Sequence, residues 1–340
     1  MKKKGYALVL LLVFLTGLLC GCAAEEKKRY QTVFLDLFDT VTTVLGYEAS
    51  EEAFRERTGE IYQALAEYDR LYDIYQEYPG MANLCTVNRH PGEPVTVDRR
   101  IIDLLLFAEQ VYGFSGGRTD AGFGAVLRLW HEAREAAEAN PDQAALPEAE
   151  ALREAAAHTG SDRIAVDQEA CTVTILDPEA SLDVGALAKG YAVQKICEML
   201  PEGYLISAGG NVAATGAKPD GSFWTIGIQD PDNPSGYVKK VRLDKGAVAT
   251  SGDYMRYYTV DGVRYHHIID PETLMPGNRW RSVTIILPDS GLADAMSTTV
   301  FLMDREEGAA LAEEMGAGVM WISPEGEMTW NSAFVAYMTE

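Results

Sequence analysis

The chain has 340 residues, of which 47% are apolar and 24% are charged, and its formal charge at pH 7 is −22. This balance is that of a foldable globular protein and excludes global disorder. The excess of carboxylates also argues against a nucleic acid or an anionic lipid surface as partner, because both would repel the chain.

The first residues have the layout of a bacterial export signal. Lysines precede an apolar run from Tyr6 to Leu19, which is short for a membrane span but typical of a secretory signal. The Leu-Cys-Gly-Cys stretch that ends at Cys22 resembles a lipobox, in which the last cysteine is acylated; an uncleaved anchor helix is the alternative. We therefore expect a signal peptide over residues 1–21 and a lipidated tether over 22–31, with the protein held on the extracytoplasmic side of the cell membrane.

Removal of such a signal would leave three unmodified cysteines, Cys85, Cys171 and Cys197. Their number is odd and none has the C-x-x-C spacing, which argues against a disulfide framework or a zinc site. We expect them to be small buried side chains.

The N-terminal half is predicted to be mainly helical after an opening strand or hairpin. Alternating β-rich residues cover 32–45, and apolar residues at helical spacing cover 50–78. A second helix is expected over 98–112, with Asp98 as its N-cap. The Ala- and Glu-rich stretch 131–158 predicts two solvated helices across a turn, to which we assign no chemistry.

The C-terminal half is predicted to be mainly β-structure. Short β-rich segments separated by Gly, Asp and Pro turns follow Arg163, a helix is expected over 293–315, and the last residues predict a hairpin. Because no repeat and no long linker interrupts the chain, we expect a single α+β unit over residues 32–340, with helices concentrated early and strands late.

One glycine- and alanine-rich stretch could bind an anion. It reads SLDVGALAKGY from Ser181 to Tyr191 and is expected to open a helix. Small residues let a ligand approach the backbone, a helix N-terminus offers free N–H groups, and Lys189 adds a positive charge. The Walker order is absent, and on the residues alone a packing turn is the commoner explanation.

Two other groups have side chains suited to catalysis or metal binding. His266 and His267 are adjacent on a predicted strand, so at most one of them faces a given site, where it could act as a base. Asp294 and Thr298 are four residues apart at the expected start of a helix and could offer two hard oxygens to Mg²⁺. On spacing alone, a hydrogen-bonded strand histidine and a helix-start carboxylate beside a packed threonine are the commoner roles.

Aromatic and loop residues earlier in the chain could contact a flat ligand. Tyr75 could stack on a flat heterocycle, and Arg118, Thr119 and Asp120 follow a pair of glycines in a predicted turn. Taken separately, such aromatic residues are more often part of a core.

In their order along the chain, these segments resemble the ApbE family, the bacterial FAD:protein FMN transferases. LDVGALAKGYAV is similar to the family's D-x-G-G-I-A-K-G run, and AGGNVAATGAKPDGSFWTIGIQDP to its glycine-rich segment and W-x-V-G-I-x-D-P block. ATSGDYMRYY, HHIIDPETLMP, SVTII and ADAMSTTVF resemble the remaining blocks, so the resemblance covers residues 32–339.

The resemblance implies roles for most of these residues. His267 is the favoured proton acceptor in the implied reaction, and Asp183 is the alternative. The Ala186 carbonyl, Asp294 and the Thr298 hydroxyl should hold Mg²⁺. Contacts with FAD are implied for Phe38, Tyr75, Arg118, Thr119, Asp120, Asp183, Lys189 and Ile268.

The sequence departs from the family pattern at three places. Residues 119–122 read TDAG where the family has F-D-P-T, the turn 38–40 reads FDT where it has M-G-T, and Ala186 replaces a glycine. Ala186 keeps its backbone carbonyl. The changes at 119–122 and 38–40 make it less certain from the resemblance which residues contact the flavin. Tyr75 also lies in a segment longer than the family's.

By this resemblance, the protein should use Mg²⁺ to transfer FMN from FAD to a Thr or Ser hydroxyl of an acceptor protein, forming a phosphoester and releasing AMP. The expected acceptors are extracytoplasmic proteins with FMN-binding domains. Two alternatives stay open: an FAD pyrophosphatase that uses water as acceptor, and a non-catalytic FAD-binding lipoprotein.

Overall fold

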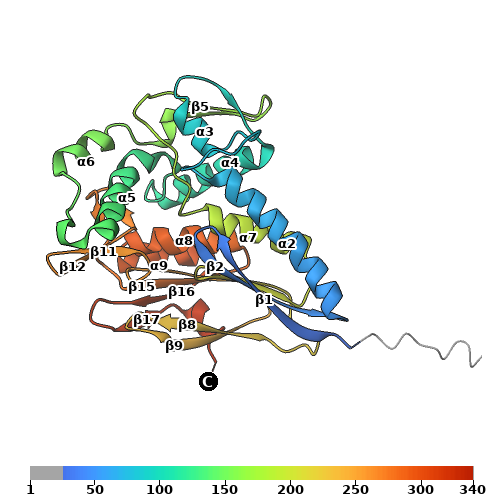
Figure 1. Ribbon diagram of the computed structural model, residues 1–340. Helices are drawn as coiled ribbons and strands as arrows, with labels where there is room; N and C mark the ends of the chain where they lie inside the picture. Colours follow the sequence, from blue (N-terminus) through green and yellow to red (C-terminus); the bar gives the residue numbers. More distant parts are fainter. Residues whose placement is uncertain (1–25, 340) are drawn as a thin grey trace, which may run out of the picture.

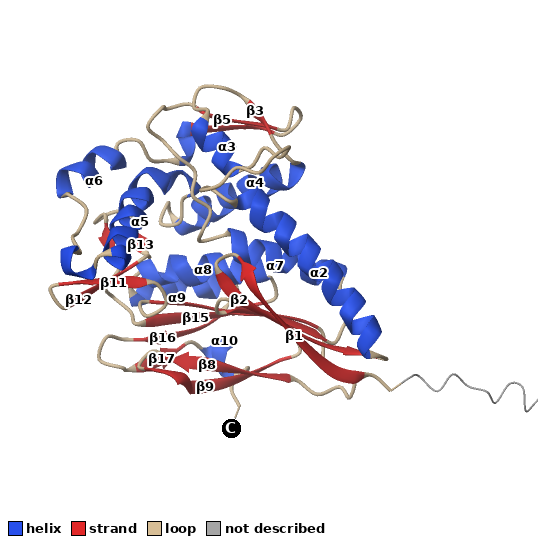
Figure 2. Ribbon diagram, viewed as in Figure 1, coloured by secondary structure: helices blue, strands red, loops and turns tan. Residues whose placement is uncertain are grey.

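An eight-stranded sheet divides the fold into a helical layer and a smaller β-layer, as the computed structural model shows in Figures 1 and 2. The structure describes residues 26–339, so the expected signal peptide and Cys22 lie outside the described residues. Within residues 26–339, no helix combines the length and the apolarity needed to span a bilayer.

Neighbouring strands of the large sheet all pair antiparallel. Their order across the sheet is β1-β2-β6-β7-β10-β15-β16-β17. Their bounds are β1 Lys28–Leu37, β2 Thr40–Glu48, β6 Tyr204–Ala208, β7 Asn211–Thr215, β10 Lys245–Gly252, β15 Ser282–Leu287, β16 Gly318–Ile322 and β17 Met328–Trp330.

Helices α7 and α8 lie on one face of this sheet, and α2, α4 and α5 build the helical half above them (Figure 1). Helix α8 is buried nearly all round, because it packs between the sheet and the other helices. The helices are α2 Glu51–Tyr72, α3 Leu84–Arg89, α4 Arg99–Ser115, α5 Gly124–Ala139, α6 Ala149–Ala156, α7 Ala188–Met199, α8 Ser290–Leu302, α9 Arg305–Glu314 and α10 Ser332–Val335.

Short strands complete the structure. The ribbon β8–β9 lies under the opposite face of the large sheet and closes a second apolar core there (Figure 2). The ribbon β11–β12 lies beside α5 (Figure 1). The bounds are β3 Val95–Thr96, β4 Ile164–Asp167, β5 Thr172–Ile175, β8 Trp224–Asp230, β9 Asn233–Leu243, β11 Tyr257–Val260, β12 Val263–His266, β13 Ile269–Asp270 and β14 Met275–Pro276.

The predicted α+β class is confirmed, with helices mostly in the N-terminal half and a large antiparallel sheet formed mainly by the C-terminal half. The opening hairpin is also confirmed, but β1 begins at Lys28 and so includes residues that the sequence placed in the tether. Tyr30 explains this earlier start, because its ring stacks on Phe54 of α2 with centroids 5.5 Å apart.

The ends of two helices differ from the prediction. Helix α2 ends at Tyr72, because the Asp73 carboxylate accepts backbone N–H groups of the next residues and turns the chain. Helix α4 continues to Ser115, and its C-cap is Gly116, whose φ of 61° suits glycine.

The helix expected over 293–315 is two helices, because Asp304 forms a capping box with Glu307 that begins α9. Helix α8 begins at Ser290 with Asp289 as its N-cap. Asp294 therefore lies in the second turn, and the expectation that it opens the helix was wrong.

The three cysteines of the described chain are free, as expected. Cys85 is buried, whereas Cys171 and Cys197 are only partly buried.

Candidate functional site

Lys189 and Asp294 meet where the first turn of α7 contacts the second turn of α8. The Lys189 Nζ lies 2.9 Å from Asp294 Oδ1 and 3.0 Å from Oδ2. The Gly190 amide also donates to Oδ2, at 2.8 Å. A Cβ on Gly190 would lie 2.3 Å from the Cβ of Asp294, so only glycine allows this approach. The structure thus joins two motifs that are far apart in the sequence.

The Ala186 carbonyl lies in the loop just before α7 and is available to a ligand. Its ordinary helical partner would be the Gly190 amide, which donates to Asp294 instead. Among the hydrogen bonds within residues 26–339, none ends on the Ala186 oxygen. Backbone carbonyls, like carboxylates, are among the oxygen ligands that bind hard cations.

Thr298 lies one turn after Asp294 on α8. Its hydroxyl is 3.2 Å from the Ser251 hydroxyl of β10, which also bonds the Ser297 hydroxyl at 2.8 Å. The carboxylate, hydroxyl and carbonyl oxygens of this region are hard ligands of the type that Mg²⁺ prefers. No cluster of three His, Cys, Asp or Glu side chains in the described chain is placed to bind a metal. A cation here would therefore need water or substrate oxygens to complete its shell.

Asp183 stands in the loop that leads to Lys189. Its Oδ1 accepts the Gly185 amide at 2.8 Å, and its own amide donates to the Ala121 carbonyl at 2.8 Å. Burial raises the pKa of this carboxyl, and the Gly185 hydrogen bond and the nearby His131 oppose the change. Asn88 braces the preceding residue, Leu182, by hydrogen bonds to both its carbonyl and its amide.

Gly124 fixes the position of the same loop from α5. A Cβ at this residue would lie 2.4 Å from the Ser181 carbonyl oxygen, which is backbone and cannot easily move. We expect Gly124→Ala to lower the free energy of unfolding by about 1–3 kcal/mol, measured by urea denaturation. Gly59→Ala is the matched control, because an added Cβ there meets nothing within 4 Å and the exposed helix should gain about 0.5–1 kcal/mol. Equal effects of the two changes would contradict the packing argument.

Tyr75 stacks on His131 with ring centroids 4.6 Å apart. Arg134 donates to His131 Nδ1 at 3.0 Å, and burial raises the pKa of the Tyr75 phenol. His131 and Arg134 come from the stretch to which the sequence assigned no chemistry. They are one turn apart on α5, and this spacing was the only signal that could have identified them.

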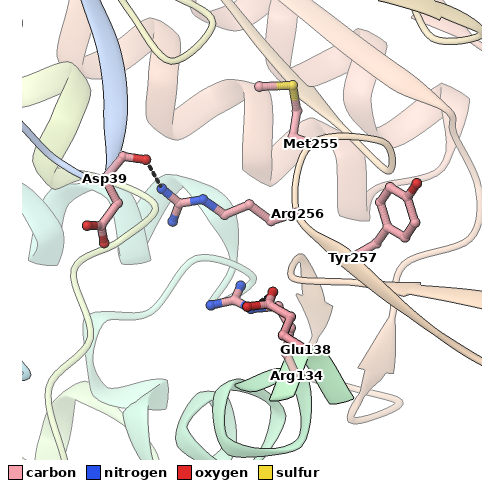
Figure 3. Close-up of a pocket in the computed structure, with 6 residues that line it drawn as sticks. All are labelled: Asp39, Arg134, Glu138, Met255, Arg256 and Tyr257. Atoms are coloured by element: carbon pink, nitrogen blue, oxygen red, sulfur yellow. Dashed lines mark hydrogen bonds and ion pairs between the residues drawn. The ribbon is translucent and has the colours of Figure 1, made fainter. Parts of the chain in front are cut away.

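A cavity of about 270 Å³ opens between α5, the turn of the β1–β2 hairpin and the segment that precedes β11 (Figure 3). In Figure 3, Arg256 extends toward Asp39 while Arg134 lies on another wall. The Arg256 guanidinium donates to the Phe38 and Asp39 carbonyls at 3.5 and 3.3 Å. The lining residues are Asp39, Arg134, Glu138, Met255, Arg256 and Tyr257.

The hairpin turn is backbone-strained. Phe38 and Asp39 have φ values of 52° and 49°, the positive values that a two-residue hairpin turn requires and that glycine adopts most easily. Each costs a non-glycine residue about 1–2 kcal/mol. The Phe38 amide donates to Asp69 Oδ1 at 3.1 Å, which fixes the turn to α2.

Asp69 should make stability depend on pH. Burial raises the pKa of its carboxyl from the ordinary 3.8 to about 6, with the hydrogen bond from Phe38 opposing and nearby carboxylates assisting. The folded state therefore binds this proton more tightly than the unfolded state. The resulting stabilisation is complete below the unfolded pKa and is lost as pH rises through about 6.

We accordingly expect Asp69→Asn to gain unfolding free energy relative to the native protein as pH rises from about 4 to about 7. Urea unfolding of both proteins across this range measures the difference. A difference that does not change with pH would contradict the assignment.

His266 and His267 differ in burial, but β12 ends at His266, so His267 lies in the bend after the strand and not on the strand as predicted. His266 is buried, with Nε2 2.6 Å from the Gly277 carbonyl, whereas the His267 side chain is exposed. His267 Nδ1 lies 3.2 Å from the Arg256 carbonyl. A carbonyl can only accept, so we assign the proton to Nδ1, which leaves Nε2 as a free acceptor.

Desolvation lowers the pKa of His267, and the charges of His266, Arg256 and Arg134 act in the same direction. The Arg256 and Arg134 charges disfavour the imidazolium independently of burial. The imidazole is then neutral near pH 7. Ile268, the next residue, is 5% exposed and belongs to the main core.

Arg118, Thr119 and Asp120 make other contacts. Arg118 pairs with Glu307 of α9 at 3.0 Å, and the Thr119 hydroxyl bonds the Thr299 hydroxyl at 2.8 Å. Asp120 accepts the Gly122 amide at 2.7 Å, and burial raises the pKa of its carboxyl. No hydrogen bond or ion pair of the described chain joins these three residues to Lys189, Asp294 or His267. Their contact with a flavin stays a prediction.

Residues 36–321 match the model of the ApbE family. A Vibrio cholerae protein named FAD:protein FMN transferase is 32% identical over 268 residues, which covers 75% of this chain and 78% of that protein. A Treponema pallidum protein of the same name is 31% identical over 356 aligned positions, with coverages of 94% and 93%.

Solved structures agree with these matches. The ApbE protein of Thermotoga maritima superimposes with a TM-score of 0.83 at 29% identity, over 92% of this chain and 100% of that one. The flavin transferase ApbE of Vibrio cholerae gives a TM-score of 0.76 at 26% identity, with the same coverages. The family match extends over most of the chain and includes the hairpin turn, the α7 loop, His267 and α8. This chain therefore belongs to the ApbE family.

Proposed function

We propose that this protein is an enzyme that transfers FMN from FAD to a Ser or Thr hydroxyl of an acceptor protein. The observation that carries the proposal is the contact of Lys189 and the start of α7 with Asp294. The Ala186 carbonyl, in the loop before α7, accepts no hydrogen bond within residues 26–339. This arrangement offers positive charge and hard oxygens at one place, which is what a pyrophosphate and its cation require. The activity by which the relatives are named supports FAD as the flavin donor.

Lys189 and the N-terminus of α7 would bind the pyrophosphate. The ammonium group has three donors, so it can bind a phosphate oxygen while it keeps a hydrogen bond to Asp294. Asp294, Thr298 and the Ala186 carbonyl would hold Mg²⁺. When bound, Mg²⁺ supplies neutralisation of the charge on the phosphate oxygens.

The proposed transfer of FMN forms one bond, breaks one bond and releases one proton, which needs an acceptor. The acceptor hydroxyl oxygen forms a bond to the phosphorus of the FMN half, the bond from this phosphorus to the AMP oxygen breaks, and AMP leaves. The hydroxyl proton passes to His267 Nε2, the ring nitrogen that the Arg256 carbonyl leaves unprotonated. Asp183 is the alternative base, although burial raises its pKa.

Water in place of the hydroxyl would make the same site an FAD pyrophosphatase. Incubation of the purified protein with FAD, Mg²⁺ and an FMN-binding acceptor domain separates the possibilities. Flavin fluorescence on the denatured acceptor supports transfer, and free FMN and AMP without labelled acceptor would indicate hydrolysis. Bound FAD that stays intact would contradict both and leave a flavin-binding role.

We also propose that Cys22 carries a lipid and holds the enzyme at the extracytoplasmic face of the membrane, near acceptors with FMN-binding domains. The support is the basic, apolar and lipobox-like order of the first residues. Labelling with a fatty acid analogue should mark the native protein but not Cys22→Ser. Equal labelling of both would refute lipidation at this cysteine.

A further inference from the structure

Arg256 connects two parts of the site that are distant in sequence. Its guanidinium donates to the carbonyls of Phe38 and Asp39, 3.5 and 3.3 Å away. Its own carbonyl accepts the His267 amide at 3.1 Å and lies 3.2 Å from His267 Nδ1. The side chain crosses the cavity toward the hairpin turn (Figure 3). One residue therefore contacts both the turn and the histidine.

The turn needs such an attachment because both of its central residues adopt positive φ without being glycine. Asp69 holds the turn through the Phe38 amide, and Arg256 holds it through the two carbonyls. Together, these bonds engage the amide that precedes the two strained residues and the carbonyls that follow each of them. Without Arg256, the carbonyls that face the cavity would lose this donor.

We propose that Arg256 is a positioning residue that clamps the Phe38–Asp39 turn against the cavity and orients His267 with its Nε2 free. The clamp fixes the wall of the cavity and the proton acceptor relative to each other. This inference rests on the proposed function only where it assigns the proton transfer to His267. The clamp itself is a property of the unliganded protein.

Arg134 provides a matched control. It lines the same cavity and its charge acts on His267 in the same direction, but it bonds His131 and not the turn. Arg256→Gln removes the charge and the guanidinium donor, and Arg256→Lys keeps the charge with a different donor geometry. Arg134→Gln removes a charge together with the contacts to His131 and Glu138, but no contact with the turn.

Hydrogen exchange of the segment 34–42 in the full protein tests the clamp without any substrate. Exchange should accelerate in Arg256→Gln and, to a smaller extent, in Arg256→Lys, and should match the native rate in Arg134→Gln. Native exchange in Arg256→Gln would overturn the clamp. Urea unfolding confirms that each variant is folded.

The imidazole ¹⁵N spectrum tests the orientation of His267. His266 is an internal reference, because its Nε2 donates to the Gly277 carbonyl while its Nδ1 accepts the Ile268 amide. His267 should show the opposite tautomer in the native protein. Arg256→Gln keeps the backbone carbonyl that bonds Nδ1 but loses the side-chain bonds that anchor this carbonyl's segment to the turn, so we expect a mixture of tautomers in that variant. The same tautomer for both histidines in the native protein would overturn the assignment.

Flavin transfer then measures the consequence for catalysis. We expect kcat to fall roughly 10- to 100-fold in Arg256→Gln, and the acid limb of its pH profile to move to higher pH because a charge that disfavours the imidazolium is gone. Arg256→Lys should keep the native acid limb. A lower kcat with an unmoved acid limb in Arg256→Gln would overturn the link to His267. Failure of the native protein to transfer flavin would refute the proposed function but leave the exchange and tautomer results to decide the clamp.

Discussion

Asp294→Asn should reduce flavin transfer at least about 100-fold, the size of effect expected when a charged group that acts on the reacting phosphate is removed. Asparagine keeps the shape of the side chain and an acceptor for the Gly190 amide, which is 2.8 Å from Oδ2 in the native protein. It loses the negative charge that Lys189 and a divalent cation would share. The expected measurement is AMP release from FAD at saturating Mg²⁺.

Binding and stability measurements show whether the cause is the cation site. Calorimetry with Mg²⁺ and FAD should show weaker cation binding in Asp294→Asn. Removal of one partner of a largely buried ion pair can cost 3–5 kcal/mol, so urea unfolding must show that the variant is folded at the assay temperature. Asp289→Asn is the control, because it changes the N-cap of the same helix to an equally good capping residue. Undiminished AMP release by Asp294→Asn would exclude Asp294 from the site.

The sequence could predict the loop that carries Lys189 and the helix that carries Asp294 and Thr298, but not the contact between them. Helical spacing placed Asp294 and Thr298 on one face, and the small residues before Lys189 indicated a close approach of the backbone. The contact between Lys189 and Asp294 joins residues 105 positions apart, and it depends on the absence of a side chain at Gly190. Such a contact is a property of tertiary packing, which local periodicity does not record.

Three residues near the cavity could not be identified from the sequence, because local composition and spacing do not record the contacts that place them there. His131 and Arg134 lie in an Ala- and Glu-rich helix whose composition is that of a solvated surface. The stacking of His131 on Tyr75 and the position of Arg134 in the cavity wall connect this helix with the candidate site. Arg256 acts through backbone carbonyls, which leave no trace in the sequence of the turn. Conversely, the family resemblance implies that Arg118 contacts the flavin, and in this structure its charge is paired with Glu307.

His267→Gln should lower the rate of flavin transfer by roughly 10²- to 10⁴-fold while FAD binding stays close to native. Glutamine can still donate to the Arg256 carbonyl but offers no basic nitrogen at the position of Nε2. The native enzyme should stay active at pH values below the ordinary pKa of histidine, because desolvation and the charges of His266, Arg256 and Arg134 disfavour the imidazolium.

His266→Gln and Asp183→Asn complete the comparison. His266 is buried and holds the Gly277 carbonyl, so its replacement should cost about 1–3 kcal/mol of unfolding free energy, but it leaves the imidazole of His267 and should therefore keep most of the transfer rate. Asp183→Asn separates the two candidate bases. If it abolishes transfer while His267→Gln retains it, the proton goes to the carboxylate, and the raised pKa of Asp183 should then appear as the acid limb. If His267→Gln is the inactive variant, the imidazole is the base, and the Asp183 carboxylate serves to hold the Gly185 amide and the loop that carries Lys189.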